Sequence, residues 1–168
     1  EEPSVKYRGI FLNDEAPSLS GWVKEKFGNY NEEFYEHVYE LILRLKGNYL
    51  WPAMWSNSFS DDGKENKIAN AELADKYGIV MGTSHHEPMC RAGVEWQRTY
   101  SQYGSSNVWD FGENEEAITE FWRQGVQRNK EFENVITLGM RGEADSSLGG
   151  TIEDNIELLK NVITTQKN

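Results

Sequence analysis

The sequence predicts an α/β fold of four consecutive strand–helix units, which is about half of a TIM-type (β/α)8 barrel. Two observations support this prediction. First, four short apolar runs alternate with amphipathic helical patterns, and this alternation favours parallel strands joined by right-handed crossovers. Second, polar and charged residues gather directly after the apolar runs, where a barrel carries its functional groups. A doubly wound sheet would fit the alternation equally well, but no glycine-rich phosphate-binding fingerprint follows any of the runs.

The length of 168 residues fits one domain but is short for a complete barrel, which needs roughly 250 residues. Half a barrel has two exposed strand edges, and exposed edges pair readily with other chains. We therefore expect residues 1–168 to be a partial catalytic barrel domain that is truncated at both ends.

The first unit begins with an apolar run at residues 5–12. Asn31 then marks the start of a helix as its N-cap, and acidic residues follow in the first turn. The spacing of apolar residues indicates one buried face. This face comprises Phe34, Val38, Leu41, Ile42 and Leu45. Gly47 is predicted to be the left-handed residue that ends the helix.

The second and third units follow the same order. Residues 48–54 form an apolar and aromatic run, and a helix over about residues 65–77 is expected to end at Gly78. Residues 79–81 form the third run, which leads through a polar segment to a helical stretch near residues 92–100.

The fourth unit has the clearest capping signals. Asn114 is a candidate N-cap for a helix whose apolar face comprises Ala117, Phe121, Trp122 and Val126. The fourth apolar run is residues 135–140. Thr151 and Asp154 resemble a capping pair at the start of a last helix. Its apolar face comprises Ile152, Ile156, Leu159, Val162 and Ile163.

The composition excludes several classes of function. The net charge is −11 and no basic stripe is present, so we expect no duplex nucleic-acid partner. The single cysteine, Cys90, excludes an intramolecular disulfide and forms no metal-binding pattern. No apolar run approaches the roughly 18 residues of a membrane span, so we expect no membrane partner. The N-terminal residues 1–3 do not resemble a signal peptide.

Candidate functional residues follow the first two runs. Asp14 and Glu15 are adjacent carboxylates, which suit a general acid or base, a metal site or a solvated turn, and the turn is the favoured interpretation of the pair alone. Trp51 and Trp55 could form a platform for a sugar ring or pack at the top of the barrel. Asn57 could exchange hydrogen bonds with a ligand there.

The last two runs add basic residues. His85 and His86 are adjacent, whereas the helical zinc motif places histidines four residues apart, so donors to a substrate or supporting contacts are favoured over a metal. Glu87 is a further candidate carboxylate. Arg141 is a natural fork for a planar carboxylate, although an ion pair with Glu143 or a neighbouring acid is equally compatible with the sequence.

These side chains together favour a pyranose ligand over a nucleotide or a metal. Asp, Glu, Asn and His suit sugar hydroxyls, an aromatic residue suits the ring face, and Arg or protonated His suits a uronic acid carboxylate. Glycoside hydrolysis requires two carboxyl groups, which an inverting enzyme holds about 6.5–9.5 Å apart.

Four segments of the chain resemble glycoside hydrolase family 115. They are residues 6–17 (KYRGIFLNDEAP), 43–55 (LRLKGNYLWPAMW), 77–89 (YGIVMGTSHHEPM) and 137–143 (TLGMRGE). The resemblance implies an α/β barrel enzyme that needs no cofactor. Its implied reaction is the inverting hydrolysis of the α-1,2 bond between glucuronic acid, or its 4-O-methyl ether, and xylose in glucuronoxylan.

The resemblance also implies roles for individual residues. Glu15 matches a catalytic carboxylate, as acid or base, and His85, His86, Glu87, Arg141 and Glu143 match residues expected to line the pocket. The partner carboxylate is expected upstream of the first segment, so this chain alone is expected to be inactive. For the full-length protein we expect a homodimer and a secreted or periplasmic location.

Two alternatives remain open at this point. A non-catalytic carbohydrate-binding module would use Trp51 and Trp55 as its platform and would be indifferent to Glu15→Gln. A different hydrolase of acidic sugars, or a phosphosugar enzyme, would differ in its substrates and, for the latter, would hold phosphate on backbone amides at a helix N-terminus.

Overall fold

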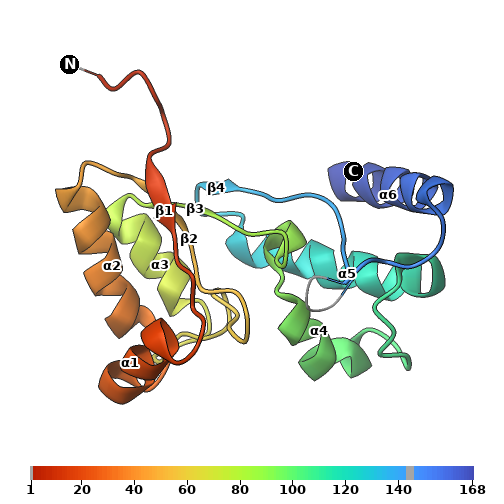
Figure 1. Cartoon of the computed structure of the whole chain (residues 1–168), viewed down its shortest axis with the longest axis horizontal. Helices are drawn as coiled ribbons and strands as arrows, with labels where there is room; N and C mark the ends of the chain where they lie inside the picture. The colour runs from red at the N-terminus through yellow and green to blue at the C-terminus, as the bar shows by residue number, and fades with distance from the viewer. Residues whose placement is uncertain (1, 143–145) are drawn as a thin grey trace.

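The computed structural model describes residues 2–142 and 146–168. Its centre is a sheet of four parallel strands in the order β1 (Gly9–Phe11), β2 (Tyr49–Trp51), β3 (Val80–Gly82) and β4 (Asn134–Val135). The sheet follows chain order, and helices lie between consecutive strands (Figure 1). The predicted α/β architecture of strand–helix units is therefore confirmed.

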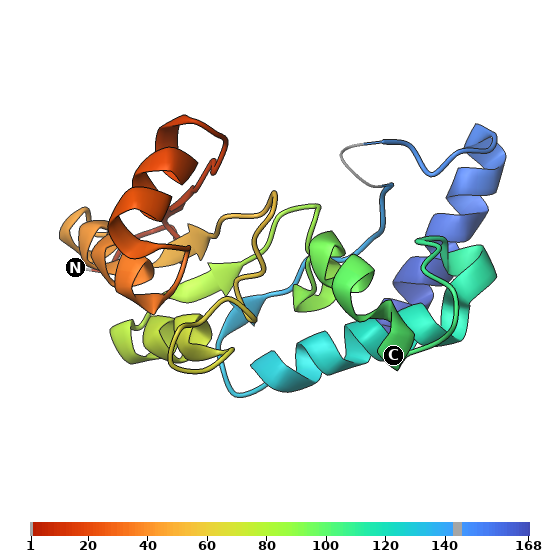
Figure 2. The same cartoon turned by 90° about the horizontal axis from the view of Figure 1, so that it is seen from below.

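Helices follow each of the strands. They are α1 (Ser18–Phe27), α2 (Glu32–Arg44), α3 (Ala69–Tyr77), α4 (Gly93–Thr99), α5 (Phe111–Asn129) and α6 (Ile152–Lys167), with short 3-10 turns at Pro88–Cys90 and Tyr100–Gln102. Figure 2 shows the strands inside an arc formed by α2, α3, α5 and α6, which is the arrangement of part of a barrel. Within the described residues, no helix combines the length and apolarity needed to cross a membrane.

Several element boundaries differ from those predicted. Helix α1 was not predicted, because it has Gly21 in its interior and buries only Val23. Helix α3 begins at Ala69 rather than near residue 65. Asn114 does not start its helix: Asp110 caps α5, where its Oδ1 accepts a hydrogen bond from the Gly112 amide at 2.8 Å. Thr151 and Asp154 do form the predicted capping box of α6.

The residue with a left-handed backbone at the end of α2 is not the predicted one. Lys46, not Gly47, has the positive φ of 60°. Gly47 donates its amide hydrogen to the Ile42 carbonyl at 2.8 Å and Lys46 donates to Leu43 at 2.9 Å, which are the two bonds of a Schellman motif. A Cβ on Gly47 would lie 2.8 Å from the Arg8 carbonyl oxygen and from Ile42 Cγ2. Glycine is needed here because the backbone of the first strand segment passes close by.

Two apolar clusters hold the helices against the sheet. The N-terminal cluster joins α1, α2 and α3 to β2 and β3, and the C-terminal cluster joins α4, α5 and α6. The most deeply buried large side chains of the first are Tyr30, Phe34, Tyr35, Tyr39, Ile42 and Leu50, and those of the second are Trp96, Phe111, Ile118, Phe121 and Trp122. The segment between them, residues 82–95, crosses from one cluster to the other.

The inner face of the sheet carries aromatic side chains. Leu50 is fully buried toward the helices, whereas its neighbours Tyr49 and Trp51 point to the opposite face. Trp51 Nε1 donates to the Tyr49 hydroxyl at 2.7 Å, and the Trp51 ring meets Phe11 edge-to-face at 6.1 Å. A Cβ on Gly82 would lie 1.7 Å from that hydroxyl, so a side chain at this position of β3 is excluded while Tyr49 stays in place.

Candidate functional site

Asp14 fastens the loop after β1 to the loop after β2. It is 3% exposed. Its Oδ1 accepts a hydrogen bond from the Met54 amide at 3.0 Å, and its Oδ2 accepts from the Trp55 amide at 3.2 Å and from Asn57 Nδ2 at 2.7 Å. Its carbonyl oxygen accepts from the Ser20 hydroxyl. Both carboxylate oxygens of Asp14 therefore hold the Trp55 segment in place.

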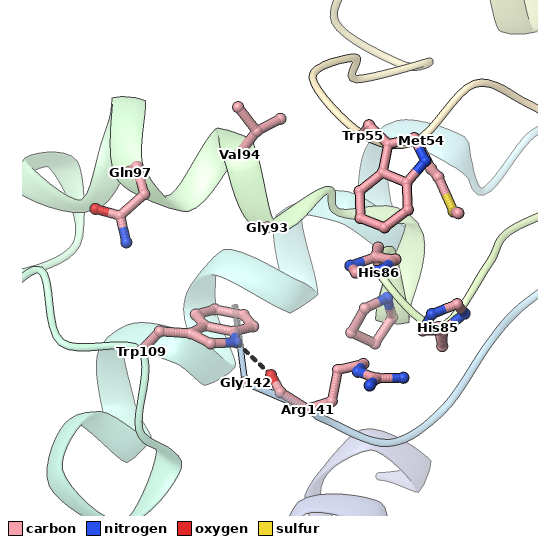
Figure 3. A pocket seen from close by; sticks show the side chains of 11 residues that line it. Met54, Trp55, His85, His86, Gly93, Val94, Gln97, Trp109, Arg141 and Gly142 are labelled. Atoms are coloured by element: carbon pink, nitrogen blue, oxygen red, sulfur yellow. Dashed lines mark hydrogen bonds between the residues drawn. The ribbon is translucent and has the colours of Figure 1, made fainter. Parts of the chain in front are cut away.

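A cavity at the carboxyl ends of the strands, here called cavity A, has a volume of about 290 Å³. It is lined by Met54, Trp55, His85, His86, Pro88, Gly93, Val94, Gln97, Trp109, Arg141 and Gly142. Figure 3 shows Trp55, the two histidines and Arg141 gathered on one side of it, with Trp109 facing them. The Trp55 and His86 ring centroids are 4.9 Å apart, and those of His85 and His86 are 4.3 Å apart.

Backbone and hydroxyl contacts fix the turn that carries the histidines. The Glu87 amide donates to the Ser84 carbonyl at 3.0 Å, and the His86 amide donates to the Ser84 hydroxyl at 3.1 Å. The Thr83 hydroxyl donates to the Glu87 carbonyl at 2.8 Å. On the opposite wall, Trp109 Nε1 donates to the Arg141 carbonyl at 3.0 Å (Figure 3). Hydrogen bonds thus fix both the histidine turn and the main chain of Arg141.

Glu87 points away from cavity A. It is 3% exposed and lines a small cavity of about 10 Å³ below the histidine turn, together with Cys90, Glu95 and Arg128. Burial, reinforced by the negative charge of Glu95, raises the pKa of Glu87 well above its usual range. Burial likewise raises the pKa of Cys90 to about 12, so its thiol is no nucleophile near neutral pH.

A buried ion pair that the sequence analysis missed supports this region. Arg128 donates to Glu95 through Nη1 at 2.7 Å and Nη2 at 3.0 Å, and Nη2 also donates to the Cys90 carbonyl at 3.0 Å. Glu95 Oε2 accepts from the Ala92 amide at 2.8 Å, at the start of α4. The residues are 33 positions apart, so no local pattern in the sequence could have revealed the pair.

The second cavity, cavity B, has a volume of about 250 Å³ and lies beside α1. It is lined by Asp14, Glu15, Ala16, Ser20, Lys24, Tyr30, Trp55, Ser56 and Asn57. Trp55 lines both cavities, and it is 37% exposed. Glu15 is exposed and belongs to cavity B only. Ser20 and Lys24 lie in α1, which was not predicted, so neither was among the predicted site residues.

The structure thus divides the predicted site residues into several groups. Cavity A gathers Trp55, His85, His86 and Arg141, whereas cavity B gathers Asp14, Glu15, Trp55 and Asn57. Trp51 lies on the inner face of the sheet and Glu87 lies beneath the histidine turn, so neither lines these two cavities. Glu143 lies outside the described residues. Among the residues that the structure describes, no group of three or more metal-binding side chains is present.

The charges of the two cavities differ. Among the described lining residues of cavity A, the ionisable groups are Arg141, His85 and His86, all of which can be positively charged. Cavity B combines the carboxyl groups of Asp14 and Glu15 with the ammonium group of Lys24. Cavity A can therefore accept an anion, and cavity B is better suited to a neutral polar ligand.

Comparison with known proteins agrees with this chemistry. Residues 1–168 match the family model of glycosyl hydrolase family 115. A similar solved structure is BtGH115A, described as a family GH115 4-O-methyl-alpha-glucuronidase with specificity for decorated arabinogalactans. It is 34% identical, with a TM-score of 0.81, and the match covers 99% of this chain and 22% of that chain. The chain therefore spans about a fifth of that protein's length. No curated protein matches the chain.

Proposed function

The chain belongs to glycosyl hydrolase family 115, and on this basis we propose that it is part of an enzyme that hydrolytically releases glucuronic acid or its 4-O-methyl ether from a polysaccharide. The observation that carries the proposal is cavity A, where Arg141 and His85 line the same space as the partly exposed Trp55. A guanidinium pairs with both oxygens of a carboxylate, and the indole provides an apolar surface for the pyranose ring.

The reaction breaks the bond between the anomeric carbon of the uronic acid and the bridging oxygen. The oxygen of a water molecule attaches to the anomeric carbon, one water proton leaves to a general base, and the bridging oxygen receives a proton from a general acid. We propose that Glu15 is one of these two groups, in an inverting mechanism. Its exposed side chain lies in cavity B, next to the residue that separates the two cavities.

Two polysaccharides are candidates for the substrate. The resemblance of the four sequence segments favours the α-1,2 linkage to xylose in glucuronoxylan. The similar structure BtGH115A is specific for decorated arabinogalactans. Both candidates present the same acidic sugar to cavity A. We further propose that the complete protein is a homodimer and acts outside the cytoplasm, where such polymers occur.

The first experiment tests the activity itself. The protein expressed from its complete reading frame is incubated with glucuronoxylan and with uronic-acid-decorated arabinogalactan, and released (4-O-methyl)glucuronic acid is quantified. Glu15→Gln should lower kcat about 10²–10⁴-fold, since it removes acid–base assistance. Glu25→Gln, at an exposed position of α1, should leave it unchanged. Equal rates in wild type and Glu15→Gln would exclude the role of Glu15, and no release from either polymer would exclude the activity.

The second experiment tests carboxylate recognition. Reducing the uronic acid to its glucose analogue should lower kcat/KM by about 30-fold or more in the wild type, because one member of a desolvated charge pair is lost. In Arg141→Met the two substrates should become nearly equivalent. Arg123→Met, which alters an exposed arginine on α5, should retain the full preference for the acid. Wild-type kinetics that do not distinguish the two sugars would contradict the assignment of cavity A.

A further inference from the structure

We propose that cavity B is the subsite for the neutral sugar to which the uronic acid is attached, and that Trp55 is the wall shared by the two subsites. The inference rests on the proposed function, because it takes cavity A as the site of the uronic acid. Beyond that function, it specifies where the neutral sugar of the substrate binds and which residues select the polymer.

The two cavities lie on either side of one loop. Met54 and Trp55 line cavity A, whereas Trp55, Ser56 and Asn57 line cavity B, so consecutive residues of one loop face both spaces. Two sugars joined through one oxygen atom must occupy adjacent sites. Asp14 fixes the main chain of this loop by binding the Met54 and Trp55 amides. The indole of Trp55 is therefore held at the place where the bond between the two sugars would lie.

The walls of cavity B suit a neutral sugar. Cavity B combines the indole of Trp55 with hydroxyl and amide groups from Ser20, Tyr30, Ser56 and Asn57. Such groups exchange hydrogen bonds with sugar hydroxyls. Cavity B also contains Glu15, which would repel a uronic acid carboxylate. The acidic sugar is thus directed to the basic cavity A and the neutral sugar to cavity B.

Only some of the polar groups that line cavity B are available to bind a ligand. Asn57 Nδ2 and both oxygens of Asp14 already bind one another or the loop backbone. The Ser56 hydroxyl and the Lys24 ammonium remain available, one from the loop after β2 and the other from α1. Within the described part of the chain, Lys24 makes no ion pair, whereas Lys26 on the same helix pairs with Glu25 at 2.9 Å. Lys24 and Ser56 are therefore the residues assigned to bind the neutral sugar.

The test separates the two subsites by choice of ligand. Free glucuronic acid, used as a competitive inhibitor, occupies cavity A alone. A disaccharide of 4-O-methylglucuronic acid and a neutral sugar occupies both cavities. The 4-nitrophenyl glycoside of the same acid retains the acid but has no sugar in cavity B. All three are assayed on the protein expressed from its complete reading frame, as wild type, Lys24→Met, Ser56→Ala and the matched control Lys26→Met.

We expect Lys24→Met and Ser56→Ala each to lower kcat/KM for the disaccharide about tenfold, as for one lost hydrogen bond. The inhibition constant of free glucuronic acid and kcat/KM for the nitrophenyl glycoside should stay within about twofold of the wild type. Lys26→Met should match the wild type throughout. Unchanged disaccharide kinetics in both cavity B variants would overturn the proposal, as would an equal loss on all three ligands. Failure of the proposed function looks different: the wild type then releases no uronic acid from any substrate.

Discussion

Replacing Asp14 by asparagine tests whether a single buried carboxylate holds the loop that separates the two cavities. The substitution keeps the size and shape of the side chain but removes its charge and one acceptor oxygen. In the native structure one oxygen accepts one hydrogen bond and the other accepts two. Comparing Asp14→Asn with the wild type therefore separates the effect of the charge and its hydrogen bonds from that of packing.

The expected magnitude follows from these three bonds. The best orientation of the new amide keeps its oxygen toward Trp55 and Asn57 and turns its NH2 group toward the Met54 amide. One bond to a charged acceptor is lost, which costs about 1.5–3 kcal/mol. The two remaining bonds become neutral and lose about half their strength. The total is about 3–6 kcal/mol, concentrated in the loop.

Hydrogen–deuterium exchange measured by mass spectrometry is the suitable assay, because it reports on the peptide that contains residues 53–57. A local loss of about 3 kcal/mol corresponds to exchange that is faster by roughly two orders of magnitude. Asp110→Asn is the matched control: Asp110 accepts one hydrogen bond as an N-cap, and asparagine caps a helix equally well. Exchange in residues 53–57 that is accelerated less than about threefold by Asp14→Asn would refute the reasoning.

Three further substitutions test other parts of the structure. Glu87→Gln should stabilise the protein at pH 8 but hardly at pH 4. Because the pKa of Glu87 is raised in the folded protein, the wild type loses stability as the pH rises above 4.5, the usual pKa of a glutamate side chain. Equal shifts in Tm at both pH values would contradict this. Arg128→Met removes the hydrogen bonds to the buried Glu95 carboxylate, which keeps Arg91 as a second counter-charge at 3.6 Å, and should cost about 1.5–3 kcal/mol in urea unfolding. A loss below about 0.5 kcal/mol would show that the pair is dispensable. Gly82→Ala pushes a methyl group into the Tyr49 hydroxyl and should destabilise by about 1–3 kcal/mol, and an unchanged Tm would show that Tyr49 moves freely.

The order of the strand–helix units could be predicted because each apolar run and each helical face repeats a period visible in the sequence. The strands are shorter than these runs, since β-structure ends where pairing ends and not where apolar residues end. Residues Pro52, Ala53 and Met54 continue the second run, yet they form a buried loop. Helix α1 could not be predicted because its burial depends on a single valine.

The site was predictable where strand ends determine it. Trp55 follows β2, the two histidines follow β3 and Arg141 follows β4, and the parallel sheet brings these three loops to one edge. The directions of adjacent side chains in a tight turn could not be predicted. His86 and Glu87 were both expected to line the pocket, but His86 lines cavity A and Glu87 lines the small cavity beneath the turn. The position of Lys24 in cavity B could not be predicted either, because it depends on the unpredicted helix α1.

The two apolar clusters give the candidate site a further property. Cavity A takes Trp55 from the side of the N-terminal cluster and Trp109 and Arg141 from the side of the C-terminal cluster. A ligand in this cavity contacts both, so it binds only while the two packed units keep their mutual position. By mass action, a ligand present at about 100 times its Kd would favour that position by about 2.7 kcal/mol. Substrate occupancy and the cohesion of the fold thus depend on the same contacts.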